Sequence, residues 1–183
     1  MDFRYIISQL KNDASLIPAL RSEKSVPDIP GLYSIFIGDP DNLPSPFGEY
    51  LKQKKSRMIY LGKATKSLQV RLVEEDLRHM RASTFFRGIG AVLGFRPPKG
   101  SLVGKKNQNN YRFSDEDTNG IIKWINNHLS VRWIELSISS IEDNEPTAIN
   151  ALRPPLNTAH NPEALPELAA LREKCRTIAL SRH

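Results

Sequence analysis

Three short stretches of this sequence have the composition of β-strands, and they limit the sheet that the chain can form. Residues 31–37 (GLYSIFI) and 58–62 (MIYLG) are rich in aromatic and β-branched side chains, whereas residues 131–138 alternate polar and apolar side chains. Helical patterns separate the second stretch from the third. This order predicts an α+β, sandwich-like fold: a small antiparallel three-stranded β-sheet flanked by helices.

Apolar residues at helical spacing predict the helices that cover this sheet. Such stripes, some shorter than others, occur in six segments: 3–10, 67–81, 84–93, 117–129, 143–152 and 162–181. Stretches rich in proline, glycine, lysine or asparagine predict long loops at 38–57 and 96–112. We therefore expect an N-terminal helical extension (1–25), a central domain (26–161) and a C-terminal helix (162–183). The last helix could form a homodimer surface, although packing against its own domain is the ordinary outcome.

The composition excludes several classes of protein. No stretch approaches the ~18 uncharged apolar residues that a membrane span needs. The N-terminus starts acidic and lacks a long apolar segment, so it does not predict a secretory signal. A single cysteine, Cys175, allows neither an internal disulfide nor a cysteine cluster for zinc. These features predict a cytoplasmic protein.

The positive charge is concentrated in the middle of the chain. Residues 52–112 contain 15 lysines and arginines against three acidic residues, which gives +12. The remaining residues contain 11 basic and 17 acidic side chains, which gives −6. A local positive field of this kind favours phosphate backbones as partners, through counterion release. The alternative is a solvated basic face that serves solubility only.

One acidic residue lies on a stripe that should face the core. The predicted helix 143–152 has its apolar residues at 148, 149 and 152, and Glu145 precedes them by three, four and seven positions. A buried carboxylate is costly unless it is paired or bound to a metal ion. The alternative is that Glu145 lies in the first turn of the helix, where an acid meets the positive end of the helix dipole.

These positions carry motifs that resemble those of GIY-YIG nuclease domains. Residues 31–33 (GLY) and 60–62 (YLG) are similar to the two motifs that name the family. Arg71 stands where the next helix of the family has its arginine. Glu145 and the later residues 154–157 (PPLN) are similar to the family's acid and its terminal motif. The ordered set is far more specific than any single motif, and the resemblance covers most of the chain.

Residues 83–94 and 124–129 are similar to segments of an uncharacterised bacterial branch of the same family. Two features depart from the family pattern. Twenty-six residues separate the motif tyrosines, where a short hairpin is usual, and the excess is the predicted loop 38–57, which could contact DNA. Glu75 occupies the position of a frequent family histidine, and the nearest histidine is His79.

The resemblance implies hydrolysis of a phosphodiester bond in DNA with one divalent metal ion, Mg²⁺ or Mn²⁺. Glu145 is the implied metal ligand. A hard cation that keeps several waters needs only one or two carboxylates in addition to phosphate oxygens. Arg71 offers a planar, permanently charged group to a phosphate oxygen. Alternatively, Arg71 forms a surface ion pair with Glu75.

The resemblance also implies that Tyr33 or Tyr60 positions or deprotonates the attacking water, and we favour Tyr33 as the base. A free tyrosine titrates near ~10, so this role requires cationic neighbours such as Lys63. Asn157 is expected to brace the site through hydrogen bonds, and His79 is the candidate for the missing histidine. The structural alternatives are two core tyrosines, a solvated lysine, a helix-capping asparagine and a surface histidine.

Basic residues of the central segment are predicted to face DNA: Arg78, Arg81, Arg87, Arg96, Lys99, Lys105 and Lys106. Contacts of this kind position a strand without reading its sequence. The sequence thus predicts a metal-dependent DNA endonuclease. The alternative is a non-catalytic nucleic-acid-binding module that retains the fold, which a salt bridge on the Glu145 carboxylate would favour. A protein-interaction domain would leave the central charge unexplained.

Overall fold

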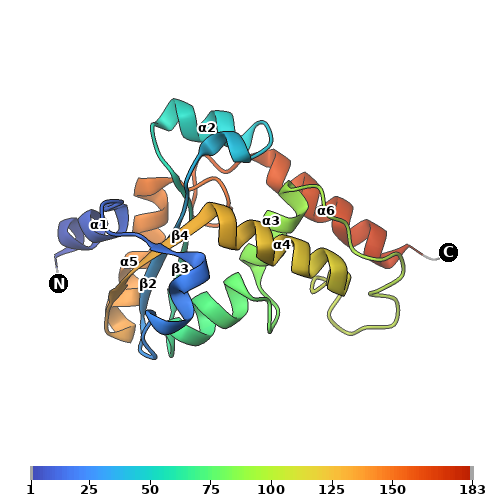
Figure 1. Cartoon of the computed structure of the whole chain (residues 1–183), viewed down its shortest axis with the longest axis horizontal. Coiled ribbons are helices and arrows are strands. Elements are labelled where there is room, and N and C mark those ends of the chain that lie inside the picture. The colour runs from blue at the N-terminus through green and yellow to red at the C-terminus, as the bar shows by residue number, and fades with distance from the viewer. Residues whose placement is uncertain (1, 182–183) are drawn as a thin grey trace.

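The computed structural model describes residues 2–181, which contain a four-stranded antiparallel sheet (Figure 1). The strands are β1 (Ile17–Pro18), β2 (Gly31–Ile37), β3 (Met58–Ala64) and β4 (Leu129–Glu135), and their order across the sheet is β1-β4-β2-β3. The α+β class and the antiparallel pairing are therefore confirmed, but the prediction of three strands was wrong. The additional strand β1 has two residues, too few to show an alternating pattern.

The register of β2 and β3 brings the two tyrosine–glycine motifs side by side. Tyr33 of β2 lies opposite Gly62 of β3, and the pairing shifts by one residue between Ile35 and Phe36. A side chain at position 62 would collide with the Tyr33 ring, so glycine leaves the space that this phenol fills. In the strand order β1-β4-β2-β3, β3 is an edge strand of the sheet, so a pocket can form beside it.

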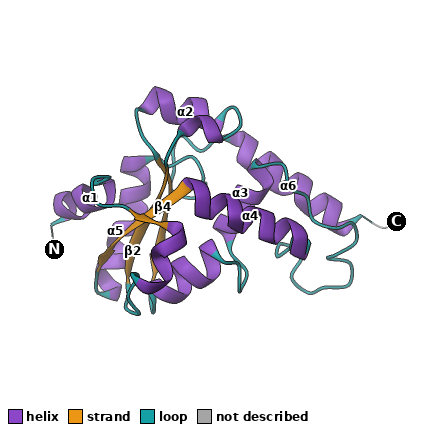
Figure 2. Ribbon diagram, viewed as in Figure 1, coloured by secondary structure: helices purple, strands orange, loops and turns teal. Residues whose placement is uncertain are grey.

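Helices make up most of the remaining structure (Figure 2). The α-helices are α1 (Phe3–Lys11), α2 (Phe47–Lys54), α3 (Thr84–Val92), α4 (Asp115–His128), α5 (Ile138–Leu152) and α6 (Pro166–Leu180). Shorter 3₁₀ helices are η1 (Ala19–Lys24) and η2 (Pro40–Asn42), and η3 (Gln69–Leu77) is a π-helix.

The sheet separates two apolar cores. On one face, α1 and α5 pack against Leu32 and Leu61. On the other face, η3, α3, α4 and α6 pack against Ile35 and its neighbours. Figure 1 shows this arrangement, with α1 and α5 on one side of the strands and α3, α4 and α6 on the other. The apolar stripe of α6, which includes Leu168 and Cys175, is buried against its own domain.

Several predicted boundaries were wrong, and each has a local reason. The predicted loop 38–57 contains α2, because Phe47 and Leu51 lie one turn apart and are both buried. Helix α5 begins at Ile138 rather than near 143, since the Ser137 side chain accepts a hydrogen bond from the Ser140 amide and caps it. Proline and acidic residues within these segments had indicated loops or later starts.

The ends of two other elements also differ from the prediction. Strand β4 starts at Leu129 and ends at Glu135, whereas the sequence predicted a helix up to residue 129 and a strand over 131–138. Helix α6 starts at Pro166, where proline is tolerated in the first turn. Among the helices of residues 2–181, none combines the length and the apolar character required to cross a membrane.

Candidate active site

A pocket of about 550 Å³ lies beside the C-terminal half of β3. Three elements supply its functional side chains: β3, π-helix η3 and helix α5. The titratable residues that line it are Tyr60, Lys63, Lys66, Arg71, Glu75, Arg81 and Glu145. The structure therefore brings together four of the residues that the sequence predicted as catalytic, from positions 85 residues apart in the chain.

Glu145 lies in the middle of α5, and its carboxylate faces this pocket. The interpretation of Glu145 as a first-turn acid is wrong, because α5 begins seven residues earlier at Ile138. Its side chain is 15% exposed, and the Lys63 ammonium donates a hydrogen bond to its Oε2 over 2.9 Å. The next residue, Pro146, lies inside the helix and has no N–H to donate. The ion pair compensates the partial burial of the carboxylate.

Arg71 is held by two acidic residues of its own helix. Its Nη1 lies 2.9 Å from Glu75 Oε2 and 3.0 Å from Asp76 Oδ1. A π-helix closes its turns with i→i+5 bonds, so residues four and five positions ahead both lie beside residue 71. The predicted pair with Glu75 is present, but the more buried partner is Asp76.

Asp76 is the residue of this site that sequence reasoning missed. It is fully buried and accepts hydrogen bonds from the Tyr33 hydroxyl (2.5 Å) and the Ser83 hydroxyl (2.6 Å). Burial raises the pKa of its carboxyl group, whereas Arg71 opposes that shift. The signal was available, since Asp76 lies four positions after Leu72 and next to Leu77, both buried. It is an acid on an apolar stripe, as Glu145 is.

The two motif tyrosines occupy different environments. Tyr33 is fully buried, and its hydroxyl proton is donated to Asp76. Tyr60 is 8% exposed, lines the pocket and packs against Phe85 at 5.0 Å between ring centroids. Burial raises the pKa of both phenols, and the Asp76 charge raises each further, while Arg71 lowers it. Both hydroxyls are therefore protonated at neutral pH.

Asn157 holds the outer edge of β3. Its side-chain oxygen accepts from the Leu61 amide at 2.9 Å, and its side-chain nitrogen donates to the Leu61 carbonyl at 2.8 Å. The preceding Leu156 amide donates to the Ile59 carbonyl at 3.0 Å. Together these bonds pair the edge strand with a short segment that replaces a fifth strand. Asn157 thus fixes the backbone between Tyr60 and Lys63.

His79 lies outside the pocket. Its ring stacks on Phe86 with 4.2 Å between centroids, and within residues 2–181 neither ring nitrogen has a hydrogen-bond partner. Burial, together with the charges of Arg112 and Arg87, lowers its pKa to about 4. The ring is therefore neutral at pH 7. Glu75, which replaces the family histidine, is the residue that faces the pocket.

The seven predicted DNA-binding residues do not form one surface patch of free charges. Arg78 is paired with Glu23 and bonds the Ala19 carbonyl, so it ties η3 to η1. Arg96 donates to the Ala91 carbonyl of α3 and to the carbonyl of the adjacent Phe95. The others are exposed or line pockets: Lys99, Lys105 and Lys106 are exposed, and Arg81 and Arg87 line two different pockets.

The donor set around the pocket suits a hard divalent cation bound mainly by water and substrate. Glu145 offers a carboxylate to the pocket, and its ion pair with Lys63 involves Oε2 only. The described part of the chain has no cluster of three or more histidine, cysteine or acidic side chains placed to hold a metal ion. Mg²⁺ and similar ions are often held by one or two carboxylates plus phosphate oxygens, so Glu145 fits that role.

The α+β domain thus brings tyrosine, arginine and glutamate side chains together around a pocket at an edge strand. The chain belongs to the GIY-YIG family, because residues 31–176 match the family model of the GIY-YIG catalytic domain. This match confirms the resemblance seen in the sequence and extends into α6. Comparisons with curated proteins and with solved structures gave no match.

Proposed function

We propose that this protein is a metal-dependent endonuclease that hydrolyses phosphodiester bonds of DNA in the pocket beside β3. The observation that carries this proposal is the convergence of Tyr60, Arg71 and Glu145 on one pocket, from three separate elements. The positive central segment supports nucleic acid as the substrate. The single cysteine, Cys175, is buried and unpaired, which agrees with a reducing cytoplasm.

Glu145 is the residue that would hold Mg²⁺ or Mn²⁺, and the bound ion would stabilise charge on the phosphate and the leaving oxygen. Lys63, released from Glu145, would then face a phosphate oxygen. Arg71 remains oriented by Asp76 and presents the rest of its guanidinium to the scissile phosphate. Glu145 and Arg71 have defined positions before substrate binds, which lowers the cost of assembling the transition state.

The geometry favours Tyr60, rather than Tyr33, as the phenol that orients the attacking water. Tyr60 lines the pocket, whereas the Tyr33 hydroxyl is buried and donates to Asp76. Tyr33 then acts as a positioning residue, since it holds the carboxylate that in turn holds Arg71. Because the pKa of Tyr60 is raised, deprotonation would require the additional positive charge of the bound metal ion.

The direct test is metal-dependent cutting of DNA by the purified protein. Supercoiled, branched and damaged DNA should be incubated with Mg²⁺ or Mn²⁺, and with EDTA as the metal-free control. We expect Glu145→Gln to reduce cutting by at least about 100-fold, a loss typical of removing a catalytic group. Glu142→Gln is the matched control, because Glu142 is exposed on the same helix and outside the pocket. Equal cutting by both variants would refute the assignment.

The second candidate is a nucleic-acid-binding module without turnover. The observation that favours it is the Lys63–Glu145 ion pair, which engages the carboxylate expected to hold the metal ion. Mn²⁺ binding followed by electron paramagnetic resonance separates the two functions. Binding that is lost in Glu145→Gln and kept in Glu142→Gln supports the enzyme. DNA binding with no Mn²⁺ binding at Glu145 supports the module.

A further inference from the structure

A second pocket, of about 230 Å³, lies between α3, α6 and the segment that precedes Tyr111. Its polar lining includes Thr84, Arg87, Asn109, Tyr111, Arg172 and Arg176. We refer to it as the arginine pocket. Three guanidinium groups in so small a volume require compensation, because isolated charges are costly to remove from water.

Two of these arginines have no compensating charge inside the protein. Among residues 2–181, neither Arg87 nor Arg172 forms a salt bridge. Arg87 Nη1 and Arg172 Nε are buried and lack any hydrogen-bond partner in this part of the chain. Arg172 Nη2 reaches the Thr84 carbonyl at 3.4 Å, and the Arg87 guanidinium lies 5.9 Å from the Tyr111 ring centroid.

The acidic residue of the arginine pocket is already occupied. Glu173 accepts from Arg176 with both carboxylate oxygens, at 2.8 and 2.7 Å. Burial lowers the pKa of Arg87 and of Arg172, which reflects the absence of a nearby carboxylate, although guanidinium groups stay protonated in proteins. The pocket therefore holds two net positive charges that only a group from outside can neutralise.

The position of Arg172 is built into the packing of α3 and α6. A Cβ atom at Gly88 would lie 2.7 Å from Arg172 Nη2, so glycine at this position lets the guanidinium rest against α3. This contact orients the planar group before any ligand arrives. Orientation in advance lowers the entropy cost of binding, which distinguishes Arg172 from a mobile surface lysine.

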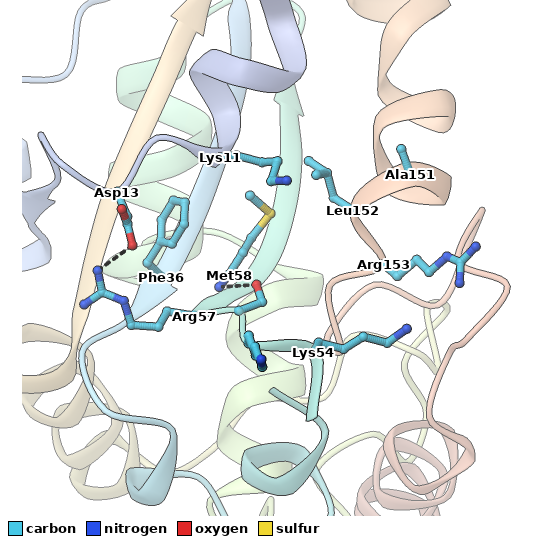
Figure 3. Close-up of a pocket in the computed structure, with 11 residues that line it drawn as sticks. Lys11, Asp13, Phe36, Lys54, Arg57, Met58, Ala151, Leu152 and Arg153 are labelled. Carbon is cyan, nitrogen blue, oxygen red and sulfur yellow. Dashed lines mark hydrogen bonds and ion pairs between the residues drawn. The ribbon is translucent and has the colours of Figure 1, made fainter. Parts of the chain in front are cut away.

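A larger basic pocket elsewhere shows the ordinary arrangement. It has a volume of about 380 Å³ and lies at the start of β3 (Figure 3). There Arg57 is paired with Asp13 at 2.7 Å, and Arg153 is paired with Glu163. Each arginine of that pocket is therefore paired with a carboxylate, although Lys11 and Lys55, which also line it, form no salt bridge among residues 2–181. The arginine pocket is different because its two central arginines are not.

The arginine pocket is also close to the pocket beside β3, which we refer to as the proposed catalytic pocket. Phe85, in the first turn of α3, packs against Tyr60, while Thr84 and Arg87 of the same turn line the arginine pocket. The charge of Arg172 lowers the pKa of Tyr60. One helical turn rises ~5.4 Å, and successive nucleotides of a DNA strand are ~3.4 Å apart along the axis, so a few nucleotides would connect the two pockets.

We propose that Arg87 and Arg172 bind an internal phosphate of the DNA strand that occupies the proposed catalytic pocket, a few nucleotides from the cut. This inference rests on the proposed function for the identity of the strand. The phosphate contacts both guanidinium groups where they line the pocket and supplies the missing negative charge. The contact fixes the position of the strand and carries no sequence information.

The test is binding of a fluorescein-labelled DNA duplex, measured by anisotropy in EDTA over a range of salt concentrations. We expect Arg172→Gln, and separately Arg87→Gln, to weaken binding about tenfold. Each should also reduce the slope of log affinity against log salt by about 0.9, the value for one lost phosphate contact. Arg4→Gln, an exposed arginine of α1, is the matched control and should change neither quantity.

Thermal unfolding distinguishes a ligand site from a structural role. Inorganic phosphate should raise the unfolding temperature of the wild type and of Arg4→Gln more than that of Arg172→Gln. Without phosphate, Arg172→Gln should unfold no earlier than wild type, because it removes an uncompensated charge. An earlier unfolding of both arginine variants, with DNA affinity and salt slope unchanged, would overturn the proposal. A loss confined to duplexes with a 5′-terminal phosphate would overturn the internal position.

The outcome is independent of catalysis. If Glu145→Gln abolishes cutting while the arginine variants bind DNA as wild type does, the arginine site is refuted and the nuclease stands. If wild type binds DNA through Arg87 and Arg172 but cuts none, the nuclease is refuted and the site stands.

Discussion

The proposed catalytic pocket and the arginine pocket both contain arginine, but Arg71 of the first is paired with carboxylates, whereas two arginines of the second are unpaired within residues 2–181. In the proposed catalytic pocket, Arg71 contacts Glu75 and Asp76, and Lys63 contacts Glu145. In the arginine pocket, Arg87 and Arg172 have no such partner within the described residues. Arg71 and Lys63 are therefore paired before substrate binds, although Lys66 and Arg81 of the same lining form no salt bridge within residues 2–181. Arg87 and Arg172 gain a charged partner only when an anion binds.

This difference has a consequence for stability and for binding. A complete set of ion pairs contributes to the folded state, and breaking a buried one exposes an uncompensated charge. Unpaired charges lower the stability of the free protein, and a ligand that pairs with them raises it again. The affinity for that ligand and the free energy of unfolding are therefore linked. Substitutions in the two pockets should therefore move stability in different directions.

The largest effect is expected for Asp76→Ala. The change leaves Arg71, Tyr33 and the Ser83 hydroxyl without their shared partner in a fully buried position. Removing one member of a buried charged network costs about 3–5 kcal/mol. Urea unfolding should show this loss. Glu75→Ala is the control, since Glu75 is partly exposed and its pair should contribute less than about 1 kcal/mol.

An equal loss in the two variants would contradict the claim that the buried network holds the proposed catalytic pocket. Asp76 would then contribute no more to the free energy of unfolding than the partly exposed Glu75 does.

The sequence was sufficient for the parts of this site that depend on long regular patterns. Strands β2 and β3 are apolar runs bounded by glycine, and Glu145 stood out as an acid on an apolar stripe. The family motifs placed Tyr60, Arg71 and Glu145 in one site, and these side chains do line one pocket. Local periodicity and ordered motifs carry this information without any knowledge of contacts.

The sequence was insufficient where the outcome depends on competition between local signals or on distant contacts. Pro46 and Gly48 indicated a loop, but burial of two apolar side chains in α2 prevailed. The π-helical turn that places Asp76 beside Arg71 has no sequence signature, since i+4 and i+5 contacts look alike in a pattern. The absence of a carboxylate partner for Arg87 and Arg172 within residues 2–181 is visible only in the three-dimensional structure.

The protonation of His79 is affected by Arg87, one of the two unpaired arginines of the arginine pocket. Burial, together with the charges of the nearby Arg112 and Arg87, lowers the pKa of His79 to about 4. The unfolded chain, with a histidine pKa of ~6.5, binds more protons between these values, so folding weakens as pH falls from about 6.5 to about 4. The full effect is about 3 kcal/mol, because each pKa unit between the folded and the unfolded value corresponds to about 1.36 kcal/mol.

The measurement compares wild type with His79→Phe by urea unfolding at pH 7 and at pH 4.5. Phenylalanine can still stack on Phe86 but cannot take up a proton. Strain from the positive φ of 54° at this position is the same at both pH values and cancels in the comparison. Wild type should lose more stability on acidification than the variant, and an equal loss would show that His79 does not titrate in this range.

The smallest effect is expected for a substitution that releases Arg176 from its ion pair, next to the unpaired Arg87 and Arg172. Glu173→Gln removes the carboxylate that holds Arg176 at the rim of the arginine pocket. Because this pair is exposed to solvent, its loss should hardly alter folding. It should raise affinity for the labelled duplex about two- to fourfold, since Arg176 becomes available to the same phosphate.

The combination with Arg172→Gln decides whether these residues act on one ligand. If Arg176 and Arg172 bind the same phosphate, the gain from Glu173→Gln should shrink when Arg172 is absent, because neighbouring substitutions are not additive. A gain of equal size in both backgrounds would mean that Arg176 attracts DNA only through the general positive field. The arginine pocket would then differ from the paired cations of Figure 3 in degree rather than in kind.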